Sequence, residues 1–430
     1  MAAILALVIF AIAFGLIASE KVDKVLVVLV AAAVILATGL VPGTDVFFDR
    51  HAGIDWNVIF LLLGMMIIVG VLKQTGLFEF LGIWAAKRSR GRPYRLMVMF
   101  MLITAIASPI LDNVTIIMLV VPVTVVVCDR LRIRAQPYII AEILASNIGG
   151  AATMIGDPPN IMIASRAGLT FNDFLVHMAP IVIVTFAVFV LVTRVMFRKD
   201  FEYHPEYAEE VMTLQERRAI TDMTLLVKSL VVLAGVILAF VLHPVLHLEP
   251  SVVALIGALV MVLVTRVDVH DVVREVEWPT LVFFAGLFVM VGSLVHTGVI
   301  ESIGHWAVGV VGHDYLAAAS TLLFGSALLG AFFDNIPYTA TMAPIVDGLV
   351  SEGTDARDGG PLWWAFALGA DFGGNGTAVA ASANVVGLGI AARSGHPISF
   401  WGFTKHGIGV TLLSTMIAWV YVALRYFVLA

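Results

Sequence analysis

Residues 56–82 read WNVIFLLLGMMIIVGVLKQTGLFEFLG, and residues 278–304 read WPTLVFFAGLFVMVGSLVHTGVIESIG. At an offset of 222 residues, nine of these 27 positions are identical, and they include the tryptophan, four glycines and one glutamate. The stretch is strongly apolar and occurs once in each half of the chain. An internal repeat in a membrane chain is typical of secondary transporters, whose binding sites lie where the two repeats meet.

The repeat continues downstream in polar residues. Asp112-Asn113 matches Asp334-Asn335 at the same offset, and two inserted residues then change the offset to 224. The pairs in this second register are Asn147 with Asp371, Gly150 with Gly374, Thr153 with Thr377, and Asn160 with Asn384. Polar residues that are repeated inside apolar segments indicate where a binding site lies.

The composition is that of an α-helical membrane protein. The 430 residues are 60% hydrophobic and 13% charged, whereas soluble domains contain about 25% charged residues. Nearly uncharged segments such as residues 25–41 and 225–242 have the length needed to cross a bilayer. The single cysteine, Cys128, excludes an internal disulfide framework and a metal site built from several cysteines. We expect a multi-pass protein of the inner (cytoplasmic) membrane that is surrounded by lipid and binds no nucleic acid.

The distribution of basic residues predicts the topology. Residues 87–95 contain five Lys or Arg residues, whereas the equivalent residues 309–317 contain none. Under the positive-inside rule, the first loop is cytoplasmic and the second is external. The two copies therefore have opposite orientations, and the N-terminus is expected outside.

The same rule predicts re-entrant segments. Residues 96–128 have basic clusters at both ends, so we expect a hairpin with Asp112-Asn113 at its tip, and two short complete spans are the alternative. The predicted fold class is an all-α polytopic membrane protein with two inverted-topology repeats, about ten transmembrane helices, two re-entrant hairpins and two discontinuous helices. The predicted boundaries are a first repeat at 1–198 with its hairpin at 96–128 and its discontinuous helix at 137–165, a cytoplasmic linker at 199–223, and a second repeat at 224–430 with its hairpin at 318–350 and its discontinuous helix at 362–392.

Two apolar segments contain helix-breaking residues. Residues 146–160 read SNIGGAATMIGDPPN, and residues 371–377 read DFGGNGT. Proline cannot donate a helical hydrogen bond, and glycine favours unwinding. Non-helical backbone at membrane depth is tolerated where it is buried in protein or lines a cavity. Exposed carbonyl groups can then bind a cation, and helix N-termini favour an anion or a dipole. We expect the two breaks and the two hairpin tips to form one site.

Five carboxylic acids lie inside apolar segments: Asp112, Glu142, Asp157, Asp334 and Asp371. A charged Asp at mid-bilayer costs ~2.5–3.5 kcal/mol on insertion scales, so such residues are usually paired, cavity-facing or functional. We interpret the aspartates as candidate proton carriers, with N-capping by the two tip aspartates as the alternative, and Glu142 is expected nearer a helix end. Neither break and neither tip contains Lys or Arg, which favours a neutral, weakly charged or cationic substrate.

Three strings carry a resemblance to a known group of proteins. They are ASPILDNVTIIMLVVPVT at 107–124, EILASNIGGAATMIGDPPNIMI at 142–163 and FFDNIPYTATMAPIV at 332–346. Over essentially its whole length the chain resembles the arsenite-exporter (ArsB), sodium–proton antiporter (NhaD) and melanosomal P-protein group of the ion-transporter superfamily, and the arsenite-exporter branch in particular. The resemblance implies a homodimer that moves a transport domain against a scaffold in an elevator motion.

The resemblance also implies site residues. It places a binding motif on Ser146, Asn147 and Thr153, with a second copy near Thr377 and Asn384. The second copy departs from the dicarboxylate pattern because it begins with an aspartate where Ser or Asn is expected. This departure favours proton-coupled exchange over sodium-coupled carboxylate binding.

We therefore predict a secondary transporter, not an enzyme, that exports arsenite or antimonite against proton influx. Sodium–proton antiport and carboxylate (citrate-like) transport are the alternatives. We expect a small inorganic substrate, no cofactor beyond a coupling H⁺ or Na⁺, and a linker that could dock a cytoplasmic ATPase subunit. The predicted binding residues are Asp112, Asn113, Ser146, Asn147, Gly150, Thr153, Asp157, Asn160, Asp334, Asn335, Asp371, Gly374, Asn375, Thr377 and Asn384.

Overall fold

The computed structural model describes residues 1–19, 21–49, 52–201, 203, 205–212, 215–311, 314–353 and 360–429. Within these ranges the regular structure is entirely helical, which confirms the predicted all-α polytopic class. Parts of the predicted linker (202, 204, 213 and 214) and of the predicted external loop (312 and 313) lie outside the described residues.

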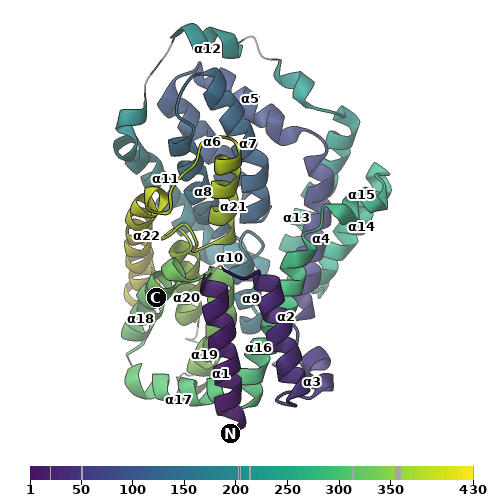
Figure 1. Cartoon of the computed structure of the whole chain (residues 1–430), viewed down its shortest axis with the longest axis vertical. Helices are drawn as coiled ribbons and strands as arrows, with labels where there is room; N and C mark the ends of the chain where they lie inside the picture. Colours follow the sequence, from purple (N-terminus) through teal and green to yellow (C-terminus); the bar gives the residue numbers. More distant parts are fainter. Residues whose placement is uncertain are drawn as a thin grey trace.

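The first half of the chain is a succession of helices that precedes a short polar connection (Figure 1). These helices are α1 (Ala2–Ser19), α2 (Lys24–Ala37), α3 (Gly43–Phe48), α4 (Trp56–Lys73), α5 (Leu77–Ser89), α6 (Pro93–Ala107), α7 (Asn113–Arg130), α8 (Gln136–Gly150), α9 (Pro158–Ala167), α10 (Phe171–His177) and α11 (Ala179–Met196). The connection contains η1 (Arg198–Asp200), α12 (Pro205–Met212) and η2 (Glu216–Ala219).

The second half repeats the succession. Its elements are α13 (Met223–Leu246), α14 (Pro250–Thr265), α15 (Val269–Arg274), α16 (Trp278–His296), α17 (Val299–Val311), α18 (Tyr315–Phe332), α19 (Asn335–Gly353), α20 (Gly360–Gly373), α21 (Ser382–Arg393), α22 (Phe400–Ala423) and η3 (Leu424–Val428). Several helices begin after an aspartate whose side chain accepts backbone N–H groups of the first turn, as Asp23 does for α2, Asp55 for α4 and Asp222 for α13.

Seven described helices are long and apolar enough to cross a membrane: α4, α7, α11, α13, α16, α18 and α22 with η3. Three further apolar helices, α2, α6 and α14, are shorter, and residues Ala2–Ile17 of α1 are apolar as well. Two of the seven, α7 and α18, belong to the helix pairs for which the sequence predicts re-entrant hairpins. In Figure 1 the pair α6–α7 lies in the upper half of the molecule, and the pair α18–α19 lies in the lower half.

The repeated glycines of α4 and α16 mark helix crossings. A Cβ atom on Gly64 would lie 2.6 Å from the backbone carbon of Ala254 in α14, and a Cβ atom on Gly286 would lie 2.7 Å from the Val28 side chain in α2. Side chains do not fit at such distances, so both positions require glycine. The identity at this pair therefore reflects packing of α4 on α14 and of α16 on α2, not substrate binding.

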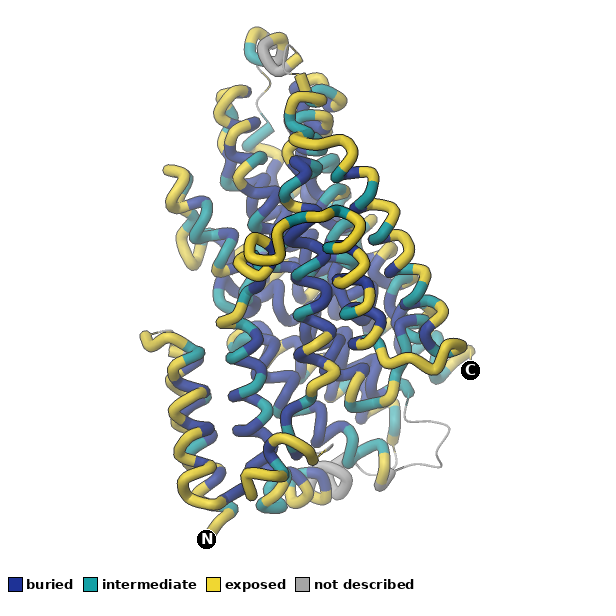
Figure 2. Tube along the Cα trace, turned by 90° about the vertical axis from the view of Figure 1, so that its right-hand side faces the viewer, coloured by how far each residue is buried: buried dark blue, intermediate teal, exposed yellow. Residues whose placement is uncertain are grey.

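The discontinuous helices form the centre of the molecule. Residues 151–157 separate α8 from α9, and residues 374–381 separate α20 from α21. Every residue of α8 from Pro137 to Gly150, and every residue of α20 from Leu362 to Gly373, is buried. Figure 2 shows this buried interior along the middle of the chain trace, with exposed residues mainly on the outer helices. Both helix breaks are therefore surrounded by protein.

Candidate functional site

Helix α8, the first half of the first discontinuous helix, contacts the break in the second discontinuous helix through three asparagines. Asn147 Nδ2 in α8 lies 2.9 Å from Asn384 Oδ1 and 3.1 Å from Asn375 Oδ1. Asn384 Nδ2, at the start of α21, donates to the carbonyl oxygens of Gly374 (2.7 Å) and Thr377 (2.8 Å). These bonds satisfy carbonyl groups that the helix break releases, and they join residues that are 237 positions apart.

Helix α9, the second half of the first discontinuous helix, repeats this arrangement with one change. Asn160 Nδ2 at the start of α9 donates to the Thr153 carbonyl at 3.1 Å, just as Asn384 does to Thr377. Asp371 in α20 lies beside Asn160 and takes the place that Asn147 has in the first repeat. Both Asp371 carboxyl oxygens and Asn160 Oδ1 are buried and make no well-aligned hydrogen bond among the described residues, while the Asn160 side chain lies next to the carboxyl group. Three acceptors without a well-aligned donor are therefore gathered between α9 and α20.

The first hairpin tip packs on the first break. Asn113 Nδ2 donates to Asp157 Oδ2 at 2.6 Å, and Ser108 Oγ lies 2.6 Å from Asn113 Oδ1 and 2.8 Å from the Ser146 carbonyl oxygen. Thr153 Oγ1 donates to the carbonyl of Pro109 at 2.5 Å, which ties the break to the turn of the hairpin. The first tip and the first break thus form one hydrogen-bonded unit.

The second tip is less satisfied than the first. The Asn335 backbone N–H donates to the carbonyl of Ala380 at 3.1 Å, but Asn335 Nδ2 has no acceptor among the described residues. The reason is a mismatch between the repeats, because Ala381 stands where Asp157 stands in the first repeat. Asn375 Nδ2 is also buried without an acceptor in the described structure. Two amide donors without an acceptor therefore lie at the second tip and in the second break.

The two tip aspartates cap helices. Asp112 accepts the Thr115 backbone N–H at 3.0 Å and the Thr115 hydroxyl at 2.5 Å, and Asp334 accepts the Ile336 backbone N–H at 3.1 Å. In the described structure, the hydrogen bonds of Asp112 stay within its own hairpin, so it does not join the break residues directly. The capping interpretation therefore holds for the geometry of both, and a role in transport stays a prediction.

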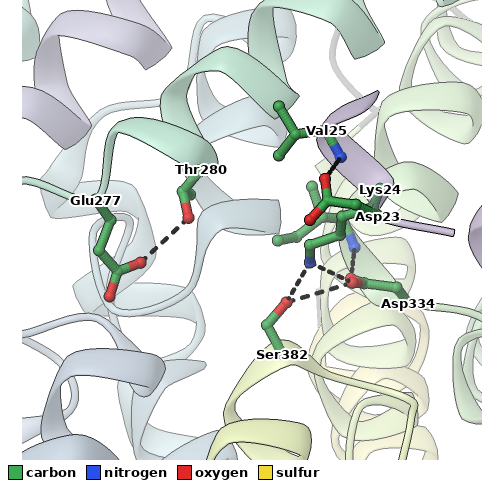
Figure 3. Close-up of polar contacts among 8 residues, drawn as sticks. Asp23, Lys24, Val25, Glu277, Thr280, Asp334 and Ser382 are labelled. Carbon is green, nitrogen blue, oxygen red and sulfur yellow. Dashed lines mark hydrogen bonds and ion pairs between the residues drawn. The ribbon is translucent and has the colours of Figure 1, made fainter. Parts of the chain in front are cut away.

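A basic residue that the sequence analysis missed reaches the second tip. Lys24 Nζ, at the start of α2, lies 3.3 Å from Asp334 Oδ2 and 2.9 Å from Ser382 Oγ (Figure 3). The sequence segments that form the two tips contain no basic residue, but the expectation that no basic group lies at either tip was wrong for the folded protein. The one sequence signal for this residue is that Lys24 directly follows Asp23 at the edge of an apolar segment.

Glu142 also differs from its expected place. It lies in the interior of α8, fully buried, and its Oε1 accepts the Thr124 hydroxyl of α7 at 2.6 Å. The sequence analysis expected a position nearer a helix end, whereas α8 begins at Gln136 and ends at Gly150. Glu142 therefore joins α8 to the first hairpin, one turn away from Ser146.

The buried positions explain the remaining predicted glycines. A Cβ atom on Gly150 would clash with Asn113 Oδ1 and would lie 2.7 Å from the Gly156 carbonyl oxygen. A Cβ atom on Gly374 would lie 3.3 Å from Asn335 Nδ2. Each glycine thus lets a hairpin tip approach the backbone of a break, and neither offers a ligand atom of its own side chain.

Two cavities open beside these elements. One, of about 720 Å³, is lined by residues of α4, α9, α16 and α19 and reaches Met154 in the first break. The other, of about 360 Å³, is lined by Lys24, Asp334 and Ser382 together with apolar residues of α1 and α21. Small solutes and water therefore have room next to one break and next to the second hairpin tip.

The chain has close relatives among transporters. Two transporters of unassigned function from Mycobacterium tuberculosis strain H37Rv, Rv2685 and Rv2684, are 52% and 50% identical to it over 426 residues, which is 99% of each chain. The P protein of Sus scrofa is 32% identical over 99% of this chain and 60% of its own length.

Solved structures of transporters share the fold. The MtrF protein of Neisseria gonorrhoeae aligns with a TM-score of 0.62 at 12% identity, covering 100% of this chain and 96% of its own. The YdaH transporter of Alcanivorax borkumensis aligns with a TM-score of 0.59 at 16% identity, covering 98% of each chain. At these identities the likeness concerns the fold alone. The P-protein relative, not these structures, supports the predicted relationship to an ion transporter family, and the arsenite-exporter branch stays a prediction.

The family model for citrate transporters (CitMHS) matches residues 14–369. Together with the relatives, this match identifies a membrane transporter and not an enzyme. The chain belongs to the citrate transporter (CitMHS) family.

Proposed function

We propose that this protein is a secondary active transporter that exports arsenite, or the related antimonite, in exchange for protons. The observation that carries the proposal is the environment of Asp371, whose two carboxyl oxygens are buried without a donor. An ionised carboxylate in such a place costs several kcal/mol, so it needs a proton or a bound cation. A proton on Asp371 would also provide the donor that Asn160 Oδ1 lacks. This position is therefore suited to bind and release a proton during each cycle.

The neighbouring amides favour a small neutral solute. Asn335 Nδ2 and Asn375 Nδ2 are donors without acceptors, and Asn147 Oδ1 and Asn160 Oδ1 are acceptors without donors in the described structure. Arsenous acid is neutral at physiological pH, and its three hydroxyl groups both donate and accept hydrogen bonds. It could satisfy both kinds of group at once without a basic side chain.

Carboxylate transport is the second candidate. The name of the family model and the position of Lys24 beside Ser382 both support it, since an ammonium group and a hydroxyl are ligands for a carboxylate. Sodium–proton antiport is the third, because the same acidic residues could hold Na⁺. The buried carboxyl groups of Asp157 and Asp371 would repel a multiply charged anion. We therefore rank arsenite above carboxylates and Na⁺ as the substrate.

The experiment is transport by the purified protein in proteoliposomes, with arsenite, antimonite, Na⁺ and citrate tested separately, with and without a pH gradient. We expect arsenite and antimonite to move when protons move in the opposite direction, and we expect Asp371→Asn to abolish the effect of the gradient. Transport of citrate alone, or of Na⁺ alone, would replace the proposed substrate. Arsenite movement that ignores the pH gradient would overturn proton coupling.

Membrane sidedness is part of the same proposal. We infer that the protein resides in the inner membrane with the basic residues after α5 inside and α17 outside, in an elevator-type homodimer. Cysteines introduced at Arg95 and Glu301, both exposed, should react with an impermeant reagent from opposite sides. Labelling of both from one side would contradict the inverted arrangement. An ATPase subunit at the linker stays a separate prediction, tested by co-purification.

A further inference from the structure

Lys24 connects elements that belong to different parts of the fold. Its ammonium group lies 3.3 Å from Asp334 Oδ2 and 2.9 Å from Ser382 Oγ, and Ser382 Oγ lies 3.3 Å from the same carboxylate oxygen. Figure 3 shows the three side chains converging from α2, from the turn between α18 and α19, and from the start of α21. The contact spans 310 positions to Asp334 and 358 to Ser382, so only the fold creates it.

Two helix N-termini meet at this point. Helix α19 begins at Asn335, directly after Asp334, and α21 begins at Ser382. Helix N-termini carry partial positive charge and favour an anion, which explains a carboxylate between them. Lys24 then neutralises a carboxylate whose side chain is only 15% exposed. The second tip therefore depends on a charge that another part of the chain provides.

Helix α2 packs mainly on α16 and α1 in the described part of the chain, not on the hairpin and the discontinuous helix that Lys24 contacts. In this packing Val28 lies against Gly286, and the Lys24 ammonium group lies 4.9 Å from the centre of the Phe283 ring in α16. Helices α18, α19 and α20 pack on one another, and α19 also contacts α16. Any movement of α18–α21 past α2 and α16 must therefore break the contact between Lys24 and Asp334.

The first tip is held differently. Asp112, the equivalent of Asp334, accepts the hydroxyl of Thr115 from its own helix, and the described structure gives it no ion pair. Pro158 stands at the equivalent of Ser382 and offers no hydroxyl. The tie to a lysine is thus a property of the second tip alone within the described residues, and the repeat does not require it.

We propose that Lys24 is a positioning residue of the transport site, which holds the N-termini of α19 and α21 against α2 while Asp334 is charged and releases them when Asp334 is neutralised. The cavity of about 360 Å³ that Lys24 and Asp334 line gives a proton or a cation access to the carboxylate. The inference rests on the proposed exchange function, because it assigns the coupling of charge to movement to one named contact.

Other charged groups near this contact are few. Asp23 precedes Lys24 and caps α2 through the backbone N–H groups of Val25 and Leu26. Glu277 at the start of α16 accepts the Thr280 hydroxyl at 3.1 Å, and Lys24, Asp112 and Lys73 act on Glu277 electrostatically. Asp334 in turn acts electrostatically on Asp157 in the first break. Since Asp334 is the one carboxylate in the described structure that Lys24 contacts directly, substituting Asp334 tests the contact more cleanly than a change of pH.

The test measures the distance between α2 and α18 by pulsed electron paramagnetic resonance, with spin labels on cysteines at Val30 and Leu328 in the full-length protein. Both positions are exposed, and the native cysteine Cys128 is buried, so a chain without added cysteines controls for background labelling. We expect Lys24→Met to shift the ratio of two distance populations about fivefold, which corresponds to roughly 1 kcal/mol for a part-exposed ion pair.

The matched variants decide between a specific contact and a general disturbance. Asp334→Asn should give the same shift, the double variant should add nothing further, and Lys24→Arg should restore the wild-type distribution. Lys21→Met removes the same charge from an exposed position three residues away and should leave the distances unchanged. Additive effects in the double variant, or equal distributions for Lys24→Met and Lys21→Met, would overturn the role of Lys24. The distances need no solute or gradient, so a failure of the proposed substrate would be recognised separately.

Discussion

Replacement of Asp371 by asparagine isolates the most unusual group of the site. In the first repeat the equivalent Asn147 donates to Asn384 Oδ1 at 2.9 Å. An asparagine at position 371 would present the same amide to Asn160 Oδ1, which has no donor in the described structure. The substitution therefore copies an arrangement that the molecule already contains, and it removes the need for a proton.

The magnitude follows from the two charge states of the wild-type residue. At low pH a protonated Asp371 can donate to Asn160 as the amide would, so the free energies of unfolding of variant and wild type should agree within about 1 kcal/mol. At high pH the ionised carboxylate keeps no donor, and an unsatisfied buried group costs about 1–3 kcal/mol or more. The wild type should therefore lose stability relative to Asp371→Asn as the pH rises.

The assay is unfolding of the detergent-solubilised protein, followed by circular dichroism at about pH 5 and about pH 9, on either side of the range in which buried carboxylic acids titrate. Asp271→Asn is the matched control, since this aspartate of α15 is 61% exposed. We expect a gap between variant and wild type that opens only at the higher pH. A gap that is the same at both values, or a variant that is less stable at high pH, would refute the idea that Asp371 exchanges a proton in the folded protein.

Two further predictions concern other parts of the chain. Gly150→Ala should lower the free energy of unfolding by about 1–3 kcal/mol and abolish transport, because the added Cβ atom would displace Asn113. Gly235 in α13 faces open space, so Gly235→Ala should instead raise the free energy of unfolding by about 0.5–1 kcal/mol in the same unfolding assay. The hydrogen bond from Lys87, at 2.6 Å, holds the pKa of Glu216 below its ordinary value, so this contact stabilises the linker above that pKa and is lost as the pH falls. Hydrogen exchange of η2 in Glu216→Gln should therefore be faster than in the wild type at neutral pH and equal to it in acid; a difference that persists in acid would exclude the ion pair as its cause.

Much of the architecture follows from local sequence. Pro158 and Pro159 form the first turn of α9, where proline is well tolerated, whereas α8 already ends at Gly150. The three glycines between 373 and 376 lie where α20 ends. The boundaries of individual helices were harder to foresee, since α2, α6 and α14 are apolar but short, and their length depends on how they pack.

The site was partly visible in the repeat. The two registers aligned Asn160 with Asn384, and the structure gives both the same backbone acceptor, seven residues earlier in the chain. The repeat could not show which polar groups lack partners, because this depends on contacts between halves. Asn335 Nδ2 is free because Ala381 replaces an acid, and that consequence appears only when the tip lies against the break.

The position of Lys24 at the second tip could not be predicted from the sequence of single segments. A search for basic residues within the breaks and tips finds none, since the lysine that neutralises Asp334 comes from the start of another helix, 310 residues away. Composition and periodicity describe single segments, whereas ion pairs between distant segments depend on the tertiary fold. For the same reason, the predicted substrate class rested on the lack of basic residues within the breaks and tips, although the folded protein places the Lys24 ammonium group at the second tip.

We propose that this protein couples solute and proton movements through buried carboxylates. The most direct measurement uses proteoliposomes that contain the purified protein and a pH-sensitive dye, to which an outward arsenite gradient is applied without an initial pH difference. We predict that the compartment that loses arsenite becomes acidic, and that Asp371→Asn eliminates this change. Arsenite efflux with a constant internal pH in the wild type, or the same acidification in Asp371→Asn, would contradict it.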